Sequence, residues 1–285
     1  MGKNFKIELH EKCSGCSPEQ TIKYLSEFVD NYGDIKLYKF LSGMEEIQEY
    51  DGEKIIKNYS LESLKNDELW MNLVLNFNDP FEFYAGKISL ENLEKMYNEK
   101  LEDLDYIANS SGFQSKKEYL DNVYDEIKCD YLVDSKVVSC LSEENKSILM
   151  WSHYANNHKG FCIEYSLKDF LDVNLIVKPV LYQRELVDIL KYESGALSQN
   201  VGLEQFYTKS IDWEYEKEWR IVHNAERNSG VSIKIPRATA IFLGCKIESA
   251  LKEQLLIIAK EKRIPCYQSV KDRYEYKLNF IDVNV

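Results

Sequence analysis

The chain has 285 residues, of which 44% are hydrophobic, so it is long enough to bury the core of one large domain or two small ones. Its formal net charge of −12 disfavours broad binding of duplex nucleic acid, which usually needs a basic face, but does not exclude a local cationic pocket for a small anion. No run approaches the ~18 apolar residues of a membrane span, and the first residues lack a secretory signal, so we expect a cytoplasmic protein with no membrane partner.

Seven cysteines without the spacing of a disulfide framework indicate reduced thiols. Cys13 and Cys16 form one Cys-x-x-Cys pair, whereas a structural zinc site usually needs four ligands. Because His10 is the only histidine nearby, we expect an incidental pair and predict no metal site.

The first part of the chain predicts helices around one strand. Residues 1–33 are expected to form a helical appendage, in which an amphipathic helix over 21–32 is closed by Gly33. A strand-like run over 34–43 ends at Ser42-Gly43. A helix over 61–70, with Leu61, Leu64 and Leu69 at helical spacing, then follows Ser60, which is a suitable N-cap residue.

Residues 86–132 differ in character and predict a helical insertion, with two charged amphipathic helices around the break Asn109–Gly112. From residue 137 onward short β-rich segments predominate, with helical pieces at 184–210 and 247–262. The expected strands are 137–144, 160–166, 177–182, 218–222, 231–235, 240–244, 266–270 and 274–283. Residues 34–285 therefore predict a single α+β domain with mixed, largely antiparallel sheets and the insertion at 86–132.

An acidic stretch, WEYEKEWRIV at 213–222, carries the most informative pattern. Glu214, Glu216 and Glu218 alternate, so a strand would place their carboxylates on one face. Such a face is most often a solvated sheet edge. Here, however, three aromatic residues flank the glutamates, and a partly desolvated carboxylate beside Arg220 can be held ionised. We interpret the stretch as a site in which Glu218 is the main candidate.

The run NFNDPFEF at 76–83 predicts a turn. Asn78 and Asp79 can bond their own backbone, and Pro80 fixes φ. The sequence leaves two interpretations open. The run is either a tight turn anchored by its phenylalanines, or a turn that presents Asn78 and Asp79 to a pocket.

The run MWSHYANNHKGFCIEYS at 150–166 also has two interpretations. His153 and His158 are five residues apart, which is poor spacing for two ligands on one helix face. Trp151, His153 and Tyr154 supply stacking surface and hydrogen-bonding groups. They either complete a buried structural network or face a substrate.

Ser139 and Ser142 straddle the end of an expected strand, where serine is usually part of a turn or a helix cap. The chain has no phosphate-binding loop, no GxGxxG after a strand, no GxSxG and no HExxH motif. These absences argue against a Rossmann or Walker-type nucleotide site.

Several runs together are similar to the bacterial family catalogued as domain of unknown function 2971, over roughly residues 35–280. They are LYKF (37–40), FNDPFE (77–82), MWSHYANNHKGFCIEY (150–165), VLY (180–182) and WEYEKEWRIV (213–222). The chain departs from the family before the FNDPFE turn, where LWMNLVLN replaces a shorter strand. This resemblance implies no activity.

The order of elements also resembles that of ADP-ribosyltransferases, which implies a split-sheet core. Tyr38 and Lys39 occupy the place of the first-strand motif, although its usual Arg or His is missing. Ser139 and Ser142 match the serine strand at a spacing one residue wider. The Glu-x-Glu strand of those enzymes is similar to residues 216–218.

By this resemblance Glu218 corresponds to the catalytic glutamate and Glu216 to the residue that activates the acceptor. Nicotinamide leaves NAD, the implied substrate, as positive charge grows on the ribose, and a preorganised carboxylate stabilises that charge. Lys39 is then expected to meet a diphosphate oxygen, and Tyr154 or Trp151 to stack on a ring. The predicted NAD-binding residues are Tyr38, Lys39, Asn78, Asp79, Ser139, Ser142, Trp151, His153, Tyr154 and Arg220.

Three functions follow from these patterns. The Glu-x-Glu pattern favours an NAD-dependent ADP-ribosyltransferase or NAD glycohydrolase. Such a bacterial effector, of toxin or phage-defence type, would use a nucleotide substrate and a macromolecular acceptor that the sequence does not identify. The second is a metal-dependent hydrolase or nuclease that uses Asp79, His153, Glu164 and Glu218 as base and ligands. The third is a non-catalytic binding module whose polar clusters only fix turns and buried networks.

Overall fold

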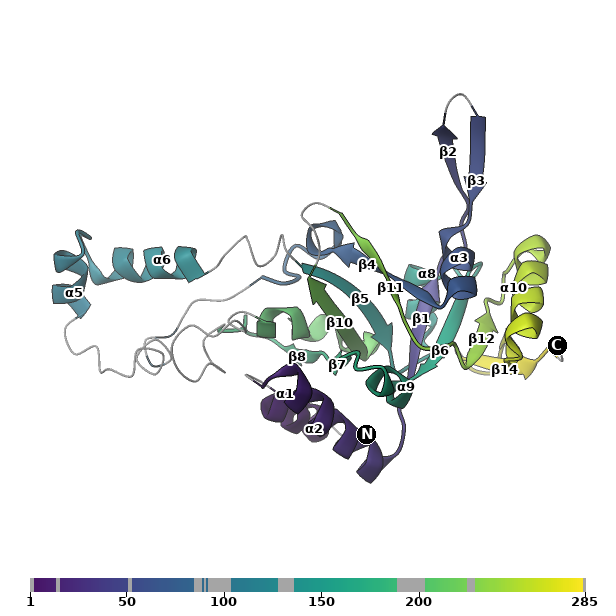
Figure 1. Ribbon diagram of the computed structural model, residues 1–285, viewed down its shortest axis with the longest axis horizontal. Helices are drawn as coiled ribbons and strands as arrows, with labels where there is room; N and C mark the ends of the chain where they lie inside the picture. The colour runs from purple at the N-terminus through teal and green to yellow at the C-terminus, as the bar shows by residue number, and fades with distance from the viewer. Residues whose placement is uncertain are drawn as a thin grey trace.

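A mixed, mostly antiparallel sheet forms the centre of the protein in the computed structural model (Figure 1). The structure describes residues 3–13, 16–50, 53–84, 89, 91, 104–127, 136–188, 203–224 and 229–283. Within these residues the main sheet has ten strands, with β11-β4-β5-β1-β6-β12-β13-β14 along its principal path. Off this path β10 pairs with β5, and β7 pairs with β10. The predicted α+β class, with mixed and largely antiparallel sheets, is confirmed.

The strands of the main sheet match most of the expected β-rich segments. Their bounds are β1 Lys36–Leu41, β4 Glu68–Leu73, β5 Lys136–Ser142, β6 Phe161–Ser166, β7 Lys178–Pro179, β10 Glu218–Asn224, β11 Val231–Lys234, β12 Ala240–Leu243, β13 Cys266–Lys271 and β14 Leu278–Asp282. Two small sheets join β2 Glu46–Tyr50 to β3 Glu53–Lys57, and β8 Leu181–Gln183 to β9 Thr208–Ser210.

The helices lie on both faces of the main sheet and beside it. The α-helices are α1 Lys3–Cys13, α2 Pro18–Tyr32, α3 Tyr59–Asn66, α5 Leu104–Ser110, α6 Lys116–Ile127, α8 Ile148–Tyr154, α9 Leu167–Asp172 and α10 Ser249–Lys262. The described part of the chain also has three short 3₁₀ helices, η1 Val74–Asn76, η2 Leu203–Tyr207 and η3 Ile211–Glu216. None of the helices in the described residues has the length and apolar character needed to span a membrane.

The sheet splits at β5. One edge of β5 pairs with β10 along its whole length, from Lys136 to Ser142. The opposite edge pairs with β1 only at Ser142 and with β4 only at Val137 and Val138. Between these two ends, the described residues supply no strand partner to that edge of β5, so β1 and β4 diverge and leave a gap.

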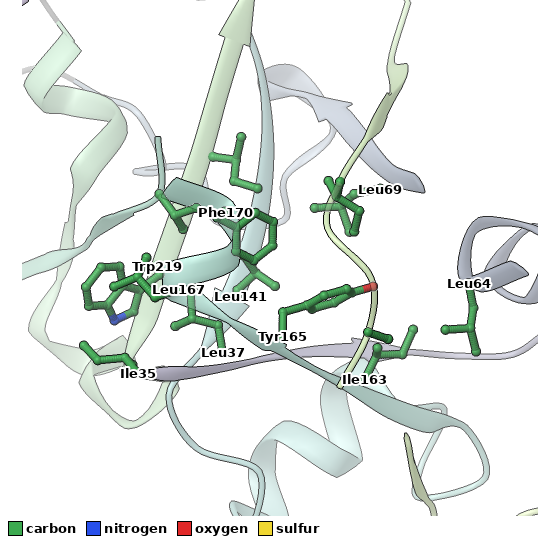
Figure 2. Close-up of a cluster of buried hydrophobic side chains, with 14 of the residues drawn as sticks. Ile35, Leu37, Leu64, Leu69, Leu141, Ile163, Tyr165, Leu167, Phe170 and Trp219 are labelled. Carbon is green, nitrogen blue, oxygen red and sulfur yellow. The ribbon is translucent and has the colours of Figure 1, made fainter. Parts of the chain in front are cut away.

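Two clusters of buried apolar side chains cover the two faces of the sheet. The larger includes Leu37, Ile163, Tyr165 and Trp219, together with residues of α9 (Figure 2). On the other face, Trp151 of α8 and Phe40 belong to the smaller cluster. The strands therefore carry apolar side chains on both faces, which explains their near-continuous hydrophobic runs.

The N-terminal helices pack onto the larger cluster. Leu25 and Phe28 of α2 belong to it, and the Phe5 ring of α1 stacks on Phe28 with 4.2 Å between the ring centroids. The predicted closure of α2 is confirmed, because Gly33 follows it with a φ of 90°. The helix begins with a capping box at Ser17.

Three local expectations are wrong. The helix expected over 61–70 ends at Asn66, because Asp67 is left-handed with a φ of 51°, and residues 68–70 belong to β4. Asn58, rather than Ser60, caps α3, because its side-chain oxygen accepts the backbone N–H of Leu61. The expected strand over 274–283 begins only at Leu278, since residues 272–277 form a turn.

The predicted insertion and the predicted helical piece over 184–210 are only partly described. The structure places α5 and α6 on either side of a turn at Gly112, as expected. In the second segment it describes η2 and β9 after residue 202. Residues 85–88, 90, 92–103, 128–135 and 189–202 lie outside the described residues.

Truncation of Leu25 tests whether α2 contributes to the common core. This side chain is fully buried, so we expect Leu25→Ala to lower the free energy of unfolding by about 2–5 kcal/mol. Ile47→Ala on β2, where the side chain is 68% exposed, is the control and should change it by less than about 0.5 kcal/mol. Urea denaturation followed by tryptophan fluorescence measures both, and equal effects would contradict the shared core.

Candidate functional site

A pocket of about 450 Å³ opens at the gap between β1 and β4. Its walls come from β1, β4, β5, α8, the Phe77–Asn78 turn and the segment around η3. The lining includes Tyr38, Lys39, Trp70, Asn72, Asn78, Cys140, Tyr154, Lys209, Glu216 and Glu218. A neighbouring hollow of about 620 Å³ shares the lining residues Lys39, Leu41, Ser60 and Trp70.

Arg220 organises the back of this pocket. The side chain is fully buried on β10, two residues after Glu218, so both side chains lie on the same face of the strand. Its guanidinium donates to both carboxylate oxygens of Glu218, at 2.7 and 3.0 Å. It also donates to the Phe206 carbonyl at 2.8 Å and to the carboxylate of Glu82.

Lys209 connects these acidic groups with a third carboxylate. Its ammonium lies 3.2 Å from Glu82, 2.7 Å from Glu216 and 3.2 Å from Glu218. Together with Arg220 these residues form what we call the buried ion cluster, in which no side chain is more than 7% exposed. The cluster holds three carboxylates and two cations.

The environment holds the Glu218 carboxylate ionised. Burial alone would raise its pKa, but the neighbouring charges of Arg220 and Lys209 outweigh burial and lower the pKa to about 2. Burial likewise opposes the charge of Lys209, yet Glu218 and Glu82 raise the pKa of its ammonium. A buried charge is stabilised in this way only while its partners stay in place.

Glu216 has the opposite tendency. Burial raises the pKa of its carboxyl, and the favourable contacts with Lys209 and Tyr154 only partly offset that effect. The Tyr154 hydroxyl donates to Glu216 at 2.5 Å from the other side of the pocket. Glu216 and Glu218 are therefore neighbouring carboxyl groups whose pKa values move in opposite directions.

The expected strand over 218–222 is confirmed as part of β10, but the alternating glutamates before it do not continue that strand. Residues up to Glu216 form η3, Lys217 is left-handed with a φ of 45°, and β10 begins only at Glu218. The Ser142 hydroxyl fixes this bend by donating to the Glu216 carbonyl at 2.5 Å. The bend, rather than strand alternation, brings the carboxylates of Glu216 and Glu218 to Lys209, while Glu214 is exposed.

Lys39 contributes a positive charge at the gap in the sheet. Its ammonium donates to the Cys140 carbonyl and to the Ser139 hydroxyl, both at 3.0 Å. Burial lowers the pKa of Lys39, and no carboxylate in the described part of the chain lies within ion-pair distance of it. Neighbouring Tyr38 lines the pocket and donates to Glu164 at 3.0 Å.

The structure does not bring every predicted site residue to the pocket. Trp151 is fully buried, and its indole N–H donates to the Asn145 carbonyl at 2.7 Å. His153 is exposed on α8 and does not line the pocket. Asp79 accepts the backbone N–H of Phe81 at 2.9 Å, which is the side-chain turn expected from the sequence, whereas Asn78 does line the pocket.

The residues of the metal-dependent alternative are dispersed. Asp79 closes a turn, His153 is exposed, and Glu164 accepts from Tyr38 and from Thr239 at 2.8 Å. Across the ranges that the structure describes, no group of three or more His, Cys, Asp or Glu side chains is arranged to hold a metal ion.

Sequence reasoning missed two members of the buried ion cluster, Glu82 and Lys209. Glu82 stands inside the FNDPFE run, and only its burial shows that it pairs with Arg220. An acidic residue among phenylalanines was a usable signal, because a buried carboxylate needs a cationic partner. Lys209 lies in no recognisable pattern.

Comparison with known protein families finds a match over part of the chain. Residues 150–221 match the model of the family described as "Protein of unknown function (DUF2971)". The predicted resemblance to this family is confirmed over that segment, which runs from α8 to β10 and is shorter than the expected 35–280. No curated protein and no solved structure matches the chain, so the resemblance to ADP-ribosyltransferases stays a prediction.

Removal of the Arg220 guanidinium tests how far the fold depends on the cluster. We expect Arg220→Met to lower the free energy of unfolding by about 3–5 kcal/mol, because Glu218 and Glu82 are left buried beside a single cation. Arg237→Met makes the same change at an exposed position and is the control. If urea denaturation gave the two variants similar stability, the cluster would not support the fold.

The raised pKa of Glu216 predicts that the free energy of unfolding depends on pH. Because its folded pKa is raised above 4.5, the linked stability is fully present below pH 4.5 and is lost as the pH rises through the folded pKa. In the Glu216→Gln variant the side chain is neutral at every pH, so this variant does not lose that stability. We therefore expect the unfolding free energy of the unmodified protein, relative to the variant, to fall from pH 4.5 toward neutrality. A flat or rising difference in denaturation at several pH values would contradict the raised pKa.

Proposed function

We propose that this pocket cleaves the bond between nicotinamide and ribose in NAD, as an NAD-dependent ADP-ribosyltransferase or an NAD glycohydrolase. The carrying observation is the pair of neighbouring carboxyl groups whose pKa values are moved apart, downward for Glu218 and upward for Glu216. Such pairs assign two roles at neutral pH, a permanent anion and a group that can take up a proton.

Glu218 suits the first role. As the C–N bond breaks, its electron pair leaves with nicotinamide and positive charge develops on the ribose. A carboxylate already ionised and held in place stabilises that charge without reorganising. Arg220 holds Glu218 through two hydrogen bonds, so its orientation is set before a ligand enters.

Glu216 suits the second role. A water molecule or an acceptor hydroxyl that attacks the ribose carbon forms the new C–O bond and must lose a proton. Glu216 has a raised pKa and lines the same pocket, so it can accept that proton. Tyr154 and Lys209 fix its two oxygens on the pocket wall.

Lys39 supports the choice of an anionic nucleotide. Both of its hydrogen bonds go to neutral oxygens, so its charge is available to a diphosphate, which would also raise the depressed pKa of its ammonium. Trp70, which is 54% exposed, offers a ring for stacking where the two hollows meet. The second hollow leaves room for the rest of a dinucleotide.

The competing function is a binding module without turnover. One observation favours it: both oxygens of Glu218 already accept hydrogen bonds from Arg220, as in a structural ion pair. Buried ion networks also perturb pKa values without catalysing a reaction. A toxin or phage-defence effector with a macromolecular acceptor is the corresponding biological proposal if the pocket does turn over NAD.

The test is release of nicotinamide from NAD by the purified protein, measured by liquid chromatography. We expect release by the unmodified protein and a loss of at least about 100-fold in Glu216→Gln, which leaves the Arg220–Glu218 pair intact. Glu218→Gln should also be inactive, but it removes the charge of one of the two carboxylates that pair with Arg220 and can therefore destabilise the fold as well.

Glu204→Gln is the matched control, because Glu204 is a buried, ion-paired glutamate that does not line the pocket. It should retain activity. If the folded, unmodified protein neither releases nicotinamide nor gains thermal stability with NAD, the proposal fails. Thermal stabilisation without release would support the binding module.

A further inference from the structure

A third hollow, of about 600 Å³ and separate from the two described above, lies at the turn between β13 and β14. Three segments build it: the turn 272–277, the loop after α8 that contains His158, and Cys245 with Lys246 after β12. None of its lining residues belongs to the buried ion cluster, so it goes beyond the function proposed above.

This hollow is lined by several positively charged side chains, although the chain as a whole is acidic. Lys246, Lys271 and Arg273 line it, and no carboxylate in the described ranges lies within ion-pair distance of any of them. The acidic groups nearby are already engaged. Glu275 pairs with Lys277 at 2.6 Å, and Asp272 serves the turn itself. Three cations therefore remain available to an anionic ligand, although the net charge of the whole chain is −12.

Two tyrosine rings project from the same turn. Tyr274 is 94% exposed and Tyr276 is fully exposed. The turn that carries them is nevertheless ordered, because Asp272 accepts the backbone N–H groups of Tyr274 at 2.8 Å and of Glu275 at 3.0 Å. Exposed aromatic rings carried on a turn with a fixed backbone offer stacking surfaces to flat ligands.

The loop that brings His158 to the hollow has strained backbone. Asn156, Asn157 and His158 have consecutive φ values of 47°, 54° and 69°, in the left-handed region that non-glycine residues rarely occupy. The His158 carbonyl accepts the backbone N–H of Lys246 at 2.9 Å, which ties the loop to a lining cation. Gly244 permits this approach, since a Cβ there would lie 2.2 Å from that carbonyl oxygen.

The same loop belongs to a motif that the first pocket uses only in part. The residues ANNHKG at 155–160 lie in the segment that matches the family model, and His158 among them lines the third hollow and not the first pocket. Backbone strain of this kind concentrates at functional sites.

We propose that this hollow binds single-stranded nucleic acid. Bases stack on Tyr274 and Tyr276, and the phosphates between them meet Lys246, Lys271 and Arg273. Phosphodiesters and flat rings together match this combination of cations and aromatic platforms. An acidic protein as ligand would pair with the cations but would not need the two exposed tyrosine rings. The acidic remainder of the chain disfavours binding of a nucleic-acid duplex.

Fluorescence anisotropy with short labelled oligothymidylate and oligouridylate tests the proposal in the full-length protein at low salt. We expect saturable binding to at least one of them, with a slope of log affinity against log salt of about −2, as three cations on a single strand predict. Tyr274→Ala with Tyr276→Ala should weaken binding by about fivefold or more. Lys271→Gln with Arg273→Gln should weaken it and flatten the salt slope.

Tyr106→Ala with Lys168→Gln removes one exposed tyrosine and one exposed lysine elsewhere and should bind normally. Absence of binding at low salt would overturn the proposal. So would undiminished affinity of the tyrosine variant together with equal competition by heparin, since the hollow would then be a general polyanion site. A thermal melt of each variant shows that it is folded.

Discussion

Burial of the Arg220 guanidinium is the constraint on which the candidate site depends. A fully buried cation must be surrounded by acceptors, and Arg220 has two carboxylates and a carbonyl. The same two carboxylates pair with Lys209, and Lys209 also pairs with Glu216. The chemistry proposed for the pocket and the stability of β10 thus rest on the same contacts. This dependence is why a glutamate outside the pocket is needed to separate lost activity from lost folding.

Much of the fold could be predicted from local patterns, because most main strands are short β-rich runs and α2 carries its own cap signals. Strand β4 is an exception, since its first residues continue the helical spacing of the residues before them. The predictions failed where a tertiary contact overrides local preference. WEYEK alternates like a strand, yet Lys217 adopts a left-handed conformation and Ser142 fixes the Glu216 carbonyl. The split at β5 could not be derived from local patterns. Pairing of one strand edge with two different strands depends on residues far apart in the sequence.

The candidate site likewise contains some residues that local sequence patterns predict and others that only the tertiary structure reveals. Glu216, Glu218 and Arg220 were predictable because they are close in sequence and stand beside aromatic residues. Lys39 and Tyr154 were singled out, and both line the pocket. Trp151 was expected at a ligand but packs inside the smaller core cluster, because a tryptophan beside an apolar helix face more often fills a core. Lys209 escaped notice because one lysine in a polar segment carries no pattern; only its three carboxylate neighbours distinguish it.

The split in the sheet makes Lys39 part of the backbone network as well as of the pocket. Its ammonium occupies the place where a neighbouring strand would otherwise satisfy the Cys140 carbonyl. At the gap, β1 is therefore held to β5 by a side chain instead of a ladder of backbone hydrogen bonds. An anionic ligand that drew Lys39 toward itself would weaken this link between β1 and β5. Occupancy of the pocket would then change how often the backbone amides of β1 and β5 beside the gap open to solvent.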